Sequence, residues 1–272
     1  MNLNEKDVID LYMESGQHRM LTAEREQRIV QLLKANDVMT VSALSERLGA
    51  SEATVRRDLQ SMHERGLLER IHGGARYKSD RVSEPLFKDK ESLNADAKSA
   101  IATAALELVK DNDTIFIDGG STLLKLVQKL DERKNLTVVT NSIMAAAILM
   151  ESGHKLILTG GEFRAISRTL VGPLSSGVLG DLAVDIAFMG TLGFTVEDGM
   201  STTDVNEAFT KTHAMKRAKK VVLLADKTKL GRNSFAKCAE GRIDVLVTDG
   251  IDDEMRRRLE DKNINVIIAK RQ

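Results

Sequence analysis

Apolar residues in the first part of the chain recur at the three- and four-residue spacing of amphipathic helices. Three such patterns follow one another, and their apolar positions are Ile29, Leu32 and Leu33, then Val41, Leu44 and Leu48, then Val55, Leu59 and Met62. Thr22 and Ser51 are suitable N-caps for the first and third helices, and Gly49 and Gly66 follow the ends of the second and third. The pattern predicts three short helices in succession.

Two short extended runs follow the third helix. In the stretch LLERIHGGARYK they flank Gly73 and Gly74, which suit a tight two-residue hairpin turn. Three helices and a hairpin in so short a stretch predict a winged helix-turn-helix. An alternative remains open at this point, in which the same helices form a dimerisation or packing module with a solvated basic face.

From Asn94 the pattern changes to a helix, Asp96–Lys110, and then to short apolar strands separated by amphipathic stretches. The expected strands are Thr114–Ile117, Thr137–Val139, Lys155–Leu158, Asp185–Met189, Val221–Leu224, Asp244–Val247 and Asn265–Ile268. The amphipathic stretches are Leu123–Leu130, Ile143–Met150, Asn206–Lys219 and Asp253–Asp261. Strands that are apolar throughout and alternate with helices favour an α/β fold with a mostly parallel sheet covered on both faces.

These patterns divide the chain into four parts. We expect an N-terminal extension over residues 1–19, a winged helix-turn-helix domain over 20–78, a linker over 79–93, and an α/β domain over 94–272. The linker has no clear periodicity and contains Pro85. It can still hold a strand or turn of its own.

Composition limits the compartment. The single cysteine, Cys238, excludes an internal disulfide and fits a reducing compartment. The longest apolar run, Ile143–Met150, is far shorter than the roughly 20 residues of a membrane span, and Met1–Met20 carries several acids and no long apolar core. We therefore expect a cytoplasmic protein that contacts no membrane.

Formal net charge is zero, so any contact with nucleic acid must rest on a local patch. Ala53–Lys78 offers one, with six Arg or Lys against three acids. In a helix that starts after Ser51, Arg57 lies opposite the apolar positions and Arg56 lies on the flank. Such a helix fits the major groove, where arginine can bond guanine. Asp58 lies nearer the buried side, so we expect it to orient an arginine or to pair within the domain.

The hairpin adds Arg70, His72, Arg76 and Lys78, which are placed to contact the DNA backbone beside the groove. Such contacts carry affinity and salt dependence but little sequence information. The candidate DNA-binding residues are Ser51, Ala53, Thr54, Arg56, Arg57, Gln60, Arg70, His72 and Arg76.

Several expected strands end in small or hydroxylated residues before a helix. In IDGGST, glycines permit close backbone approach, and the hydroxyl groups lie beside free N–H groups at a helix start, where an anion is favoured. One such loop alone can also be a plain strand-to-helix turn. The stretches VVTNS, ILTGGEF and AFMGTLGF repeat the arrangement, and the carboxyl ends of parallel strands meet at one edge of a sheet.

Lysines farther along the chain can neutralise a phosphate group, namely Lys211 and the Lys227–Lys229 loop. We therefore expect one polyhydroxylated, phosphorylated ligand at the strand ends. The candidate effector-binding residues are Asp118, Gly119, Gly120, Ser121, Thr122, Thr140, Asn141, Ser142, Gly160, Gly161, Gly190 and Lys211.

A long ordered string, Arg25–Ala75, resembles the N-terminal domain of the DeoR family of bacterial transcriptional regulators over its whole length, including SEATVRRDL and the ending RIHGGA. The resemblance implies that this domain binds operator DNA and that Ser51–Gln60 is its recognition helix. The family pattern usually starts close to the beginning of the chain, whereas here it starts after Met20.

The following half, about Ser92–Gly250, resembles the effector domain of the same family. The matching pieces are DGGST at 118–122, TNS at 140–142, DIAFMG at 185–190, Glu207 to Lys211, Ala225-Asp226 and Lys229-Leu-Gly231. The resemblance implies a fold related to ribose-5-phosphate isomerase and an effector that is a phosphorylated sugar.

The isomerases keep an Asp-Gly-Ala-Asp run after one strand, and the corresponding stretch here is Met189-Gly190-Thr191-Leu192. Where those enzymes carry their glutamate base, the alignment places Lys211. A proton transfer between adjacent carbons needs a placed carboxylate base, so we expect no catalytic residue and no enzyme activity. The five histidines show no metal-ligand spacing, and neither a metal nor a cofactor is expected.

The sequence thus predicts a DNA-binding transcriptional regulator, a repressor of a carbohydrate-utilisation operon, controlled by a phosphorylated sugar and acting as a homo-oligomer, a dimer or tetramer. One alternative is a sugar-phosphate isomerase-like enzyme fused to a DNA-binding module. The other is an activator or architectural DNA binder whose sensor domain no longer senses.

Overall fold

The computed structural model describes residues 22–36, 38–64, 68–77, 84–238 and 242–270. The chain divides into two compact units, with the boundary between residues 80 and 81. Three sequence-based expectations lie outside the described residues: the extension over 1–19, the helix stop at Gly66 and the contact from Lys78.

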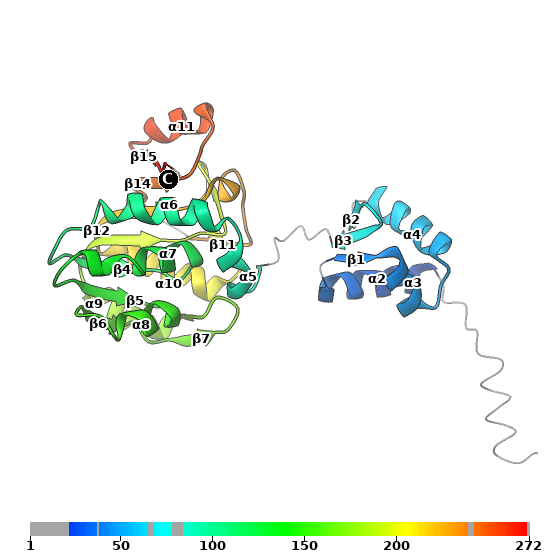
Figure 1. Cartoon of the computed structure of the whole chain (residues 1–272), viewed down its shortest axis with the longest axis horizontal. Coiled ribbons are helices and arrows are strands. Elements are labelled where there is room, and N and C mark those ends of the chain that lie inside the picture. Colours follow the sequence, from blue (N-terminus) through cyan, green and yellow to red (C-terminus); the bar gives the residue numbers. More distant parts are fainter. Residues whose placement is uncertain (1–21, 37, 65–67, 78–83, 239–241, 271–272) are drawn as a thin grey trace, which may run out of the picture. The chain divides into compact units, whose positions relative to one another are not determined.

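The first unit packs three helices against a three-stranded antiparallel sheet of order β1-β3-β2 (Figure 1). Its elements are α2 (Thr22–Asn36), β1 (Val38–Thr40), α3 (Val41–Leu48), α4 (Glu52–Glu64), β2 (Leu68–Ile71) and β3 (Gly74–Tyr77). The predicted apolar positions form one buried core, except Leu32, which packs against it half-buried. The expected winged helix-turn-helix is confirmed.

The helix ends in this unit follow local capping chemistry. The Ala43 N–H donates to the Thr40 side chain at 3.2 Å and the Thr54 N–H donates to the Ser51 hydroxyl at 3.3 Å. Gly49 ends α3 with φ 61°, a conformation that glycine adopts without a steric penalty. The predicted roles of Ser51 and Gly49 are therefore confirmed.

The hairpin turn lies one residue earlier than predicted. It is formed by His72 and Gly73, whereas Gly74 already belongs to β3 and lies opposite both Ile71 of β2 and Thr40 of β1. A Cβ atom on Gly74 would lie 2.2 Å from the Met39 carbonyl oxygen. Gly74 is therefore required by the approach of β1, a strand that the sequence pattern did not predict.

The second unit is built on a seven-stranded sheet of order β15-β14-β12-β9-β4-β5-β6. Its strands are β4 (Thr114–Ile117), β5 (Thr137–Thr140), β6 (Lys155–Leu158), β9 (Val184–Met189), β12 (Ala218–Leu224), β14 (Val245–Thr248) and β15 (Asn265–Ile268). Every neighbouring pair in this sheet is parallel. All seven predicted strands are confirmed, with ends that shift by at most a few residues.

Helices cover both faces of this sheet (Figure 1). They are α6 (Ala95–Leu106), α7 (Ser121–Val127), α8 (Ile143–Leu149), α9 (Ser176–Asp181), α10 (Val205–Lys216) and α11 (Asp253–Glu260). Successive residues of β4 point to opposite faces: Ile115 and Ile117 join the core under α6, α7 and α8, and Phe116 joins the core that includes residues of α9, α10 and α11. The expected α/β architecture is confirmed.

Two small antiparallel sheets were not predicted. They pair β7 (Glu162–Arg164) with β8 (Thr169–Val171), and β10 (Gly193–Thr195) and β13 (Ala236–Lys237) with β11 (Gly199–Thr202). These strands are two to four residues long. Such short runs carry too little periodicity to be told from loops.

The expectation of a linker over residues 79–93 is wrong for its described part. Residues 87–92 form helix α5 (Phe87–Ser92), and Phe87 is buried and donates its backbone N–H to the Ile166 carbonyl at 3.1 Å. The chain from Glu84 onward therefore belongs to the second unit. The sequence did not predict this docking, because one buried aromatic side chain in a non-periodic stretch forms no recognisable pattern.

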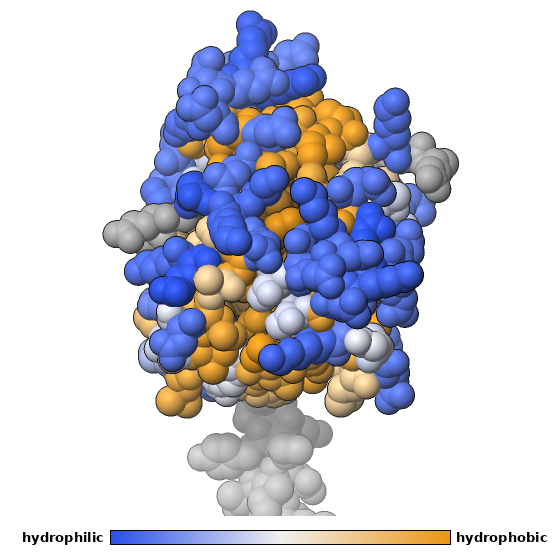
Figure 2. Space-filling model, turned by 90° about the vertical axis from the view of Figure 1, so that its left-hand side faces the viewer, coloured by the Kyte–Doolittle hydropathy of each residue, from blue (hydrophilic) through white to orange (hydrophobic). Residues whose placement is uncertain are grey.

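The surface of the second unit is mostly hydrophilic in the view of Figure 2, with apolar side chains showing in patches between charged ones. No helix in the described part of the chain combines the length and apolarity that crossing a membrane would need.

Candidate functional site

A pocket opens at the carboxyl ends of β4, β9 and β12. In chain order the strands run outward from β4 in one direction to β5 and β6, and from β9 in the other to β12, β14 and β15. The strand order therefore reverses between β4 and β9, the position at which open α/β sheets bind ligands. The lining includes residues 119–123 after β4, residues 190–192 after β9, residues 224–226 after β12, and side chains from α5, α6 and α10.

The loop after β4 presents unsatisfied hydrogen-bonding groups to this pocket. Neither the backbone N–H groups nor the hydroxyls of Ser121 and Thr122 have a hydrogen-bond partner among the described residues. Gly120 has φ 149°, and a Cβ atom on Gly119 would lie 2.0 Å from Thr169 Cγ2. Glycine is needed at both positions to shape the loop, whose free N–H groups suit an anion.

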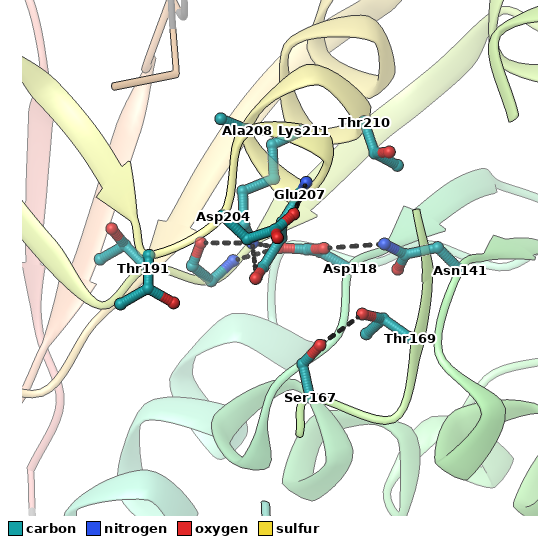
Figure 3. Close-up of polar contacts among 12 residues, drawn as sticks. Asp118, Asn141, Ser167, Thr169, Thr191, Asp204, Glu207, Ala208, Thr210 and Lys211 are labelled. Atoms are coloured by element: carbon teal, nitrogen blue, oxygen red, sulfur yellow. Dashed lines mark hydrogen bonds and ion pairs between the residues drawn. The ribbon is translucent and has the colours of Figure 1, made fainter. Parts of the chain in front are cut away.

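Lys211 of α10 is fully buried behind the loop and pairs with two carboxylates (Figure 3). Its ammonium donates to Asp118 and to the Gly190 carbonyl, and it lies 3.5 Å from Glu207. Burial alone would lower the pKa of Lys211, but Asp118 and Glu207 outweigh burial and raise it. Burial raises the pKa of Glu207. Lys211 is therefore a cation whose charge the protein already balances.

Two other lysines bring less compensated positive charge to the pocket. Lys98 of α6 is 4% exposed and donates to the backbone carbonyls of Lys90 and Leu93. Burial lowers the pKa of Lys98 to about 8 and also lowers the pKa of Lys229. The Lys229 side chain makes no hydrogen bond or ion pair with the residues that the structure describes. A bound anion would favour the charged form of both.

The structure brings together only part of the predicted effector site. Gly119, Gly120, Ser121, Thr122, Gly190 and Lys211 line the pocket, and Asp118 lies directly behind it. Thr140, Asn141 and Ser142 are buried under the loop, and Gly160 and Gly161 lie in the turn between β6 and β7 at the sheet edge. The pocket lies over β4, β9 and β12, so loops after β5 and β6 do not reach it.

The buried residues after β5 have structural partners. The Thr140 hydroxyl donates to the Ile117 carbonyl at 2.6 Å, the Asn141 amide donates to Asp118 at 3.3 Å, and Ser142 caps α8. Asn141 thus holds the carboxylate that pairs with Lys211 (Figure 3).

Sequence reasoning missed Glu84, Lys90, Lys98 and Asp226 as pocket residues. Lys98 lies on a helix with many alanines, three and four residues before the buried Ile101 and Ala102. A charged residue at a buried helix position is the only signal that would have singled it out.

The first unit exposes the predicted face of α4. Ala53, Arg56, Arg57 and Gln60 are exposed, and Thr54 is half-buried. Arg57 makes no hydrogen bond or ion pair within the described residues, so its guanidinium is available for a base. Arg56 instead pairs with Glu52 one turn earlier at 2.5 Å.

The hairpin residues Arg70, His72 and Arg76 are also exposed. Arg70 donates to Gln60 at 2.7 Å, which ties the hairpin to α4.

Asp58 lies on the inner face of α4, as predicted, and is 6% exposed. Arg25 of α2 donates to both of its oxygens, from Nε at 2.5 Å and from Nη2 at 3.1 Å. This hydrogen bond raises the pKa of Arg25. The pair fixes α4 against α2 and so sets the orientation of α4.

Comparison with known proteins identifies both units. Residues 25–81 match the DeoR-like helix-turn-helix domain, and residues 93–250 match the DeoR C terminal sensor domain. A helix-turn-helix unit joined to a sensor unit defines a DNA-binding regulator of transcription. The chain belongs to the DeoR family of transcriptional regulators.

Its relatives match along nearly their full length. The HTH-type transcriptional regulator GlpR of Haloferax volcanii is 38% identical over 250 residues, which cover 91% of this chain and 98% of that protein. The lactose phosphotransferase system repressor of Staphylococcus epidermidis is 31% identical over 243 residues, which cover 87% and 96%. Ribose 5-phosphate isomerase A of Methanocaldococcus jannaschii is 22% identical over 50% of this chain and 55% of that one, with a TM-score of 0.38.

Proposed function

We propose that this regulator is a repressor of a carbohydrate-utilisation operon and that a phosphorylated sugar in the pocket of the second unit controls its affinity for the operator. The observation that carries the proposal is the meeting of the Gly119–Thr122 loop with Lys98 and Lys229 at the switch point of the sheet. Free N–H groups, the buried Lys98 and the half-buried Lys229, both of lowered pKa, are surroundings that favour the binding of a phosphate group.

The carbohydrate part of the proposal is supported by a relative and by the polar lining of the pocket. A phosphotransferase system repressor named for lactose is among the relatives. Thr191, Glu207 and Asp226 line the same pocket. The Thr191 hydroxyl can donate a hydrogen bond to a sugar hydroxyl or accept one from it, and the two carboxylates can accept one.

We propose further that the pocket binds its ligand without converting it. The stretch after β9 supplies Thr191 and Leu192 to the pocket, neither of which can act as a carboxylate base. Glu207 is the buried carboxylate of raised pKa in the pocket, which is the property of a general base. Its oxygens, however, lie 3.5 Å from Lys211 and 3.4 Å from Arg164, which supports a structural role.

We also propose that the protein acts as a homo-oligomer in the cytoplasm, a dimer or tetramer that pairs two recognition helices on an operator. Large apolar side chains are exposed on the second unit: Leu174 at 81%, Met150 at 68% and Val205 at 61%. Such side chains are often covered in an assembly.

A thermal-shift screen tests the proposal. The full-length protein is heated with ribose 5-phosphate, fructose 1-phosphate, glucose 6-phosphate and the corresponding unphosphorylated sugars. A phosphorylated sugar at 100 times its dissociation constant should stabilise the folded protein by about 2.7 kcal/mol, and its unphosphorylated partner should not. The hit should change the affinity for operator DNA and remain unconverted. No shift with any phosphorylated sugar, or turnover of the hit, would contradict the proposal.

A further inference from the structure

The carboxylate of Glu84 is the most firmly held group near the boundary between the two units. It is 3% exposed and accepts from Lys90 at 2.7 Å, from Thr203 at 2.7 Å and pairs with Arg164 at 2.8 Å. These partners outweigh the effect of burial and lower the pKa of Glu84. Glu84 is the first described residue after the unit boundary, and these contacts fix the start of the described part of the second unit.

Helix α5 follows Glu84. Its C-terminal end is held by Lys98, which lines the pocket described above. The Lys98 ammonium donates to the carbonyl of Lys90 within α5 and to the carbonyl of Leu93 just after it. Lys90 and Lys98 therefore hold the segment 84–93 in place from two sides, and both lysines line the pocket.

The cations that fix this segment are thus among those available to an anionic ligand. The pocket lining holds four lysines, Lys90, Lys98, Lys211 and Lys229, and the three acids Glu84, Glu207 and Asp226. Lys211 is already balanced by Asp118 and Glu207. A phosphate group in the pocket must therefore draw on Lys90, Lys98 and Lys229, and it brings its negative charge toward the carboxylate of Glu84.

We propose that ligand and Glu84 compete for Lys90, so that occupancy of the pocket weakens the attachment of segment 84–93 and is thereby transmitted to the chain that leads to the DNA-binding unit. This inference rests on the proposed function, because it assumes an anion in the pocket. It adds the residues through which that anion acts.

The remaining contacts define what happens to Glu84 when Lys90 turns to the ligand. Glu84 keeps Arg164, but Arg164 is shared with Glu207 at 3.4 Å and Asp204 at 3.6 Å. One guanidinium then faces three carboxylates, of which Glu207 also lies near Lys211. The attachment of Glu84 is weakened but not lost, as a reversible switch requires.

Substitution of Glu84 by Gln tests the competition. Glutamine keeps the size and the hydrogen bond with Thr203 but removes the charge. With inorganic phosphate and ribose 5-phosphate as probes, Glu84→Gln should bind more tightly than the wild type, by about fivefold or more, the lower end of usual coupling between sites. Calorimetric titration of the full-length protein gives the two dissociation constants. Asp89→Asn is the matched control, since Asp89 is an exposed carboxylate on α5 that does not line the pocket.

Amide hydrogen exchange over residues 86–93 reports the attachment directly. In the wild type, phosphate should speed exchange of this segment, including the Phe87 N–H that donates to the Ile166 carbonyl. In Glu84→Gln the exchange should be fast without phosphate and should change little when phosphate is added. Lys90→Gln, which removes the other partner, should show the same fast exchange but weaker phosphate binding, and Glu84→Gln should have no further effect on affinity in its background.

The outcomes separate the two proposals. Probe binding with equal affinity in the wild type and Glu84→Gln, or exchange of residues 86–93 that phosphate leaves unchanged, overturns the role of Glu84 and leaves the sensing function standing. If neither probe binds to any of the variants, the pocket does not bind an anion. The proposed function is then contradicted together with this inference. If Glu84→Gln does not fold, Lys90→Gln carries the same test.

Discussion

Individual buried charged side chains stabilise the packing inside each of the two units. Asp58 could be recognised from its place on the inner face of a helix, and the structure pairs it with Arg25. The pairing of Lys211 could not be predicted from the sequence, because its partner Asp118 lies 93 residues away. An ion pair of this kind is specified by which strand ends meet, and no local pattern in the sequence encodes that.

The lowered pKa of Lys98 leads to a pH dependence. Lys98 in the free protein loses its proton near pH 8, and a bound anion favours the charged form. Affinity for a sugar phosphate should therefore be constant from pH 7 to 8 and should fall above pH 8 by up to about tenfold per pH unit, since binding then takes up a proton. Calorimetric titration between pH 7 and 9.5 measures this.

Arginine keeps its charge throughout this range, so Lys98→Arg should bind with an affinity that changes little with pH. Lys229→Arg is the comparison, because burial lowers the pKa of Lys229 as well. An equal decline in Lys98→Arg and the wild type would show that another group is responsible.

At the scale of elements, the periodic pattern predicted the long apolar strands and the amphipathic helices correctly. It missed the short elements. Strand β1 was missed, and with it the reason for Gly74: a two-residue turn explained two adjacent glycines equally well. The helix α5 was taken for linker because its docking rests on one buried side chain, Phe87.

The approach of β1 predicts that Gly74→Ala destabilises the first unit. The added methyl group would lie 2.2 Å from the Met39 carbonyl oxygen and 3.0 Å from the Met39 carbonyl carbon. Backbone cannot rotate away as a side chain can, so β1 and β3 must separate, at a cost of about 1–3 kcal/mol. Urea unfolding of the full-length protein should show an earlier transition of the first unit and an unchanged transition of the second.

Gly73→Asn is the control for this change. Gly73 has φ 78° and nothing within 4 Å of its Cβ position, and asparagine tolerates this backbone region. It should alter stability by less than Gly74→Ala does. The opposite order would show that the turn, and not the approach of β1, sets the requirement for glycine.

At the scale of the whole molecule, reading DNA and sensing a ligand belong to separate units, so substitutions should separate the two activities. Arg57→Ala should weaken binding to a selected operator duplex by about 1–3 kcal/mol, roughly tenfold to over a hundredfold, and leave ligand affinity intact. Lys229→Glu should leave operator affinity of the ligand-free protein intact and lower ligand affinity at least about tenfold, the loss of one charged hydrogen bond. Gel-shift and calorimetric titrations measure both.

Lys227→Glu is the matched control, because Lys227 lies in the same short 3₁₀ helix, Lys227–Lys229, but does not line the pocket. It should change neither affinity. Loss of both activities in a folded Lys229→Glu protein would contradict the separation of the two units.

The amino-acid sequence by itself determined the winged helix-turn-helix, the seven strands, the outward face of α4 and the loop Gly119–Thr122, because each of these depends on residues close together in the chain. Only the tertiary structure decided the pocket. The order of the strands in the sheet selected the loops after β4, β9 and β12 and excluded those after β5 and β6. It also brought in Glu84 and Lys90 from a stretch without periodicity and Lys98 from a predicted helix, since contacts between distant segments leave no local pattern.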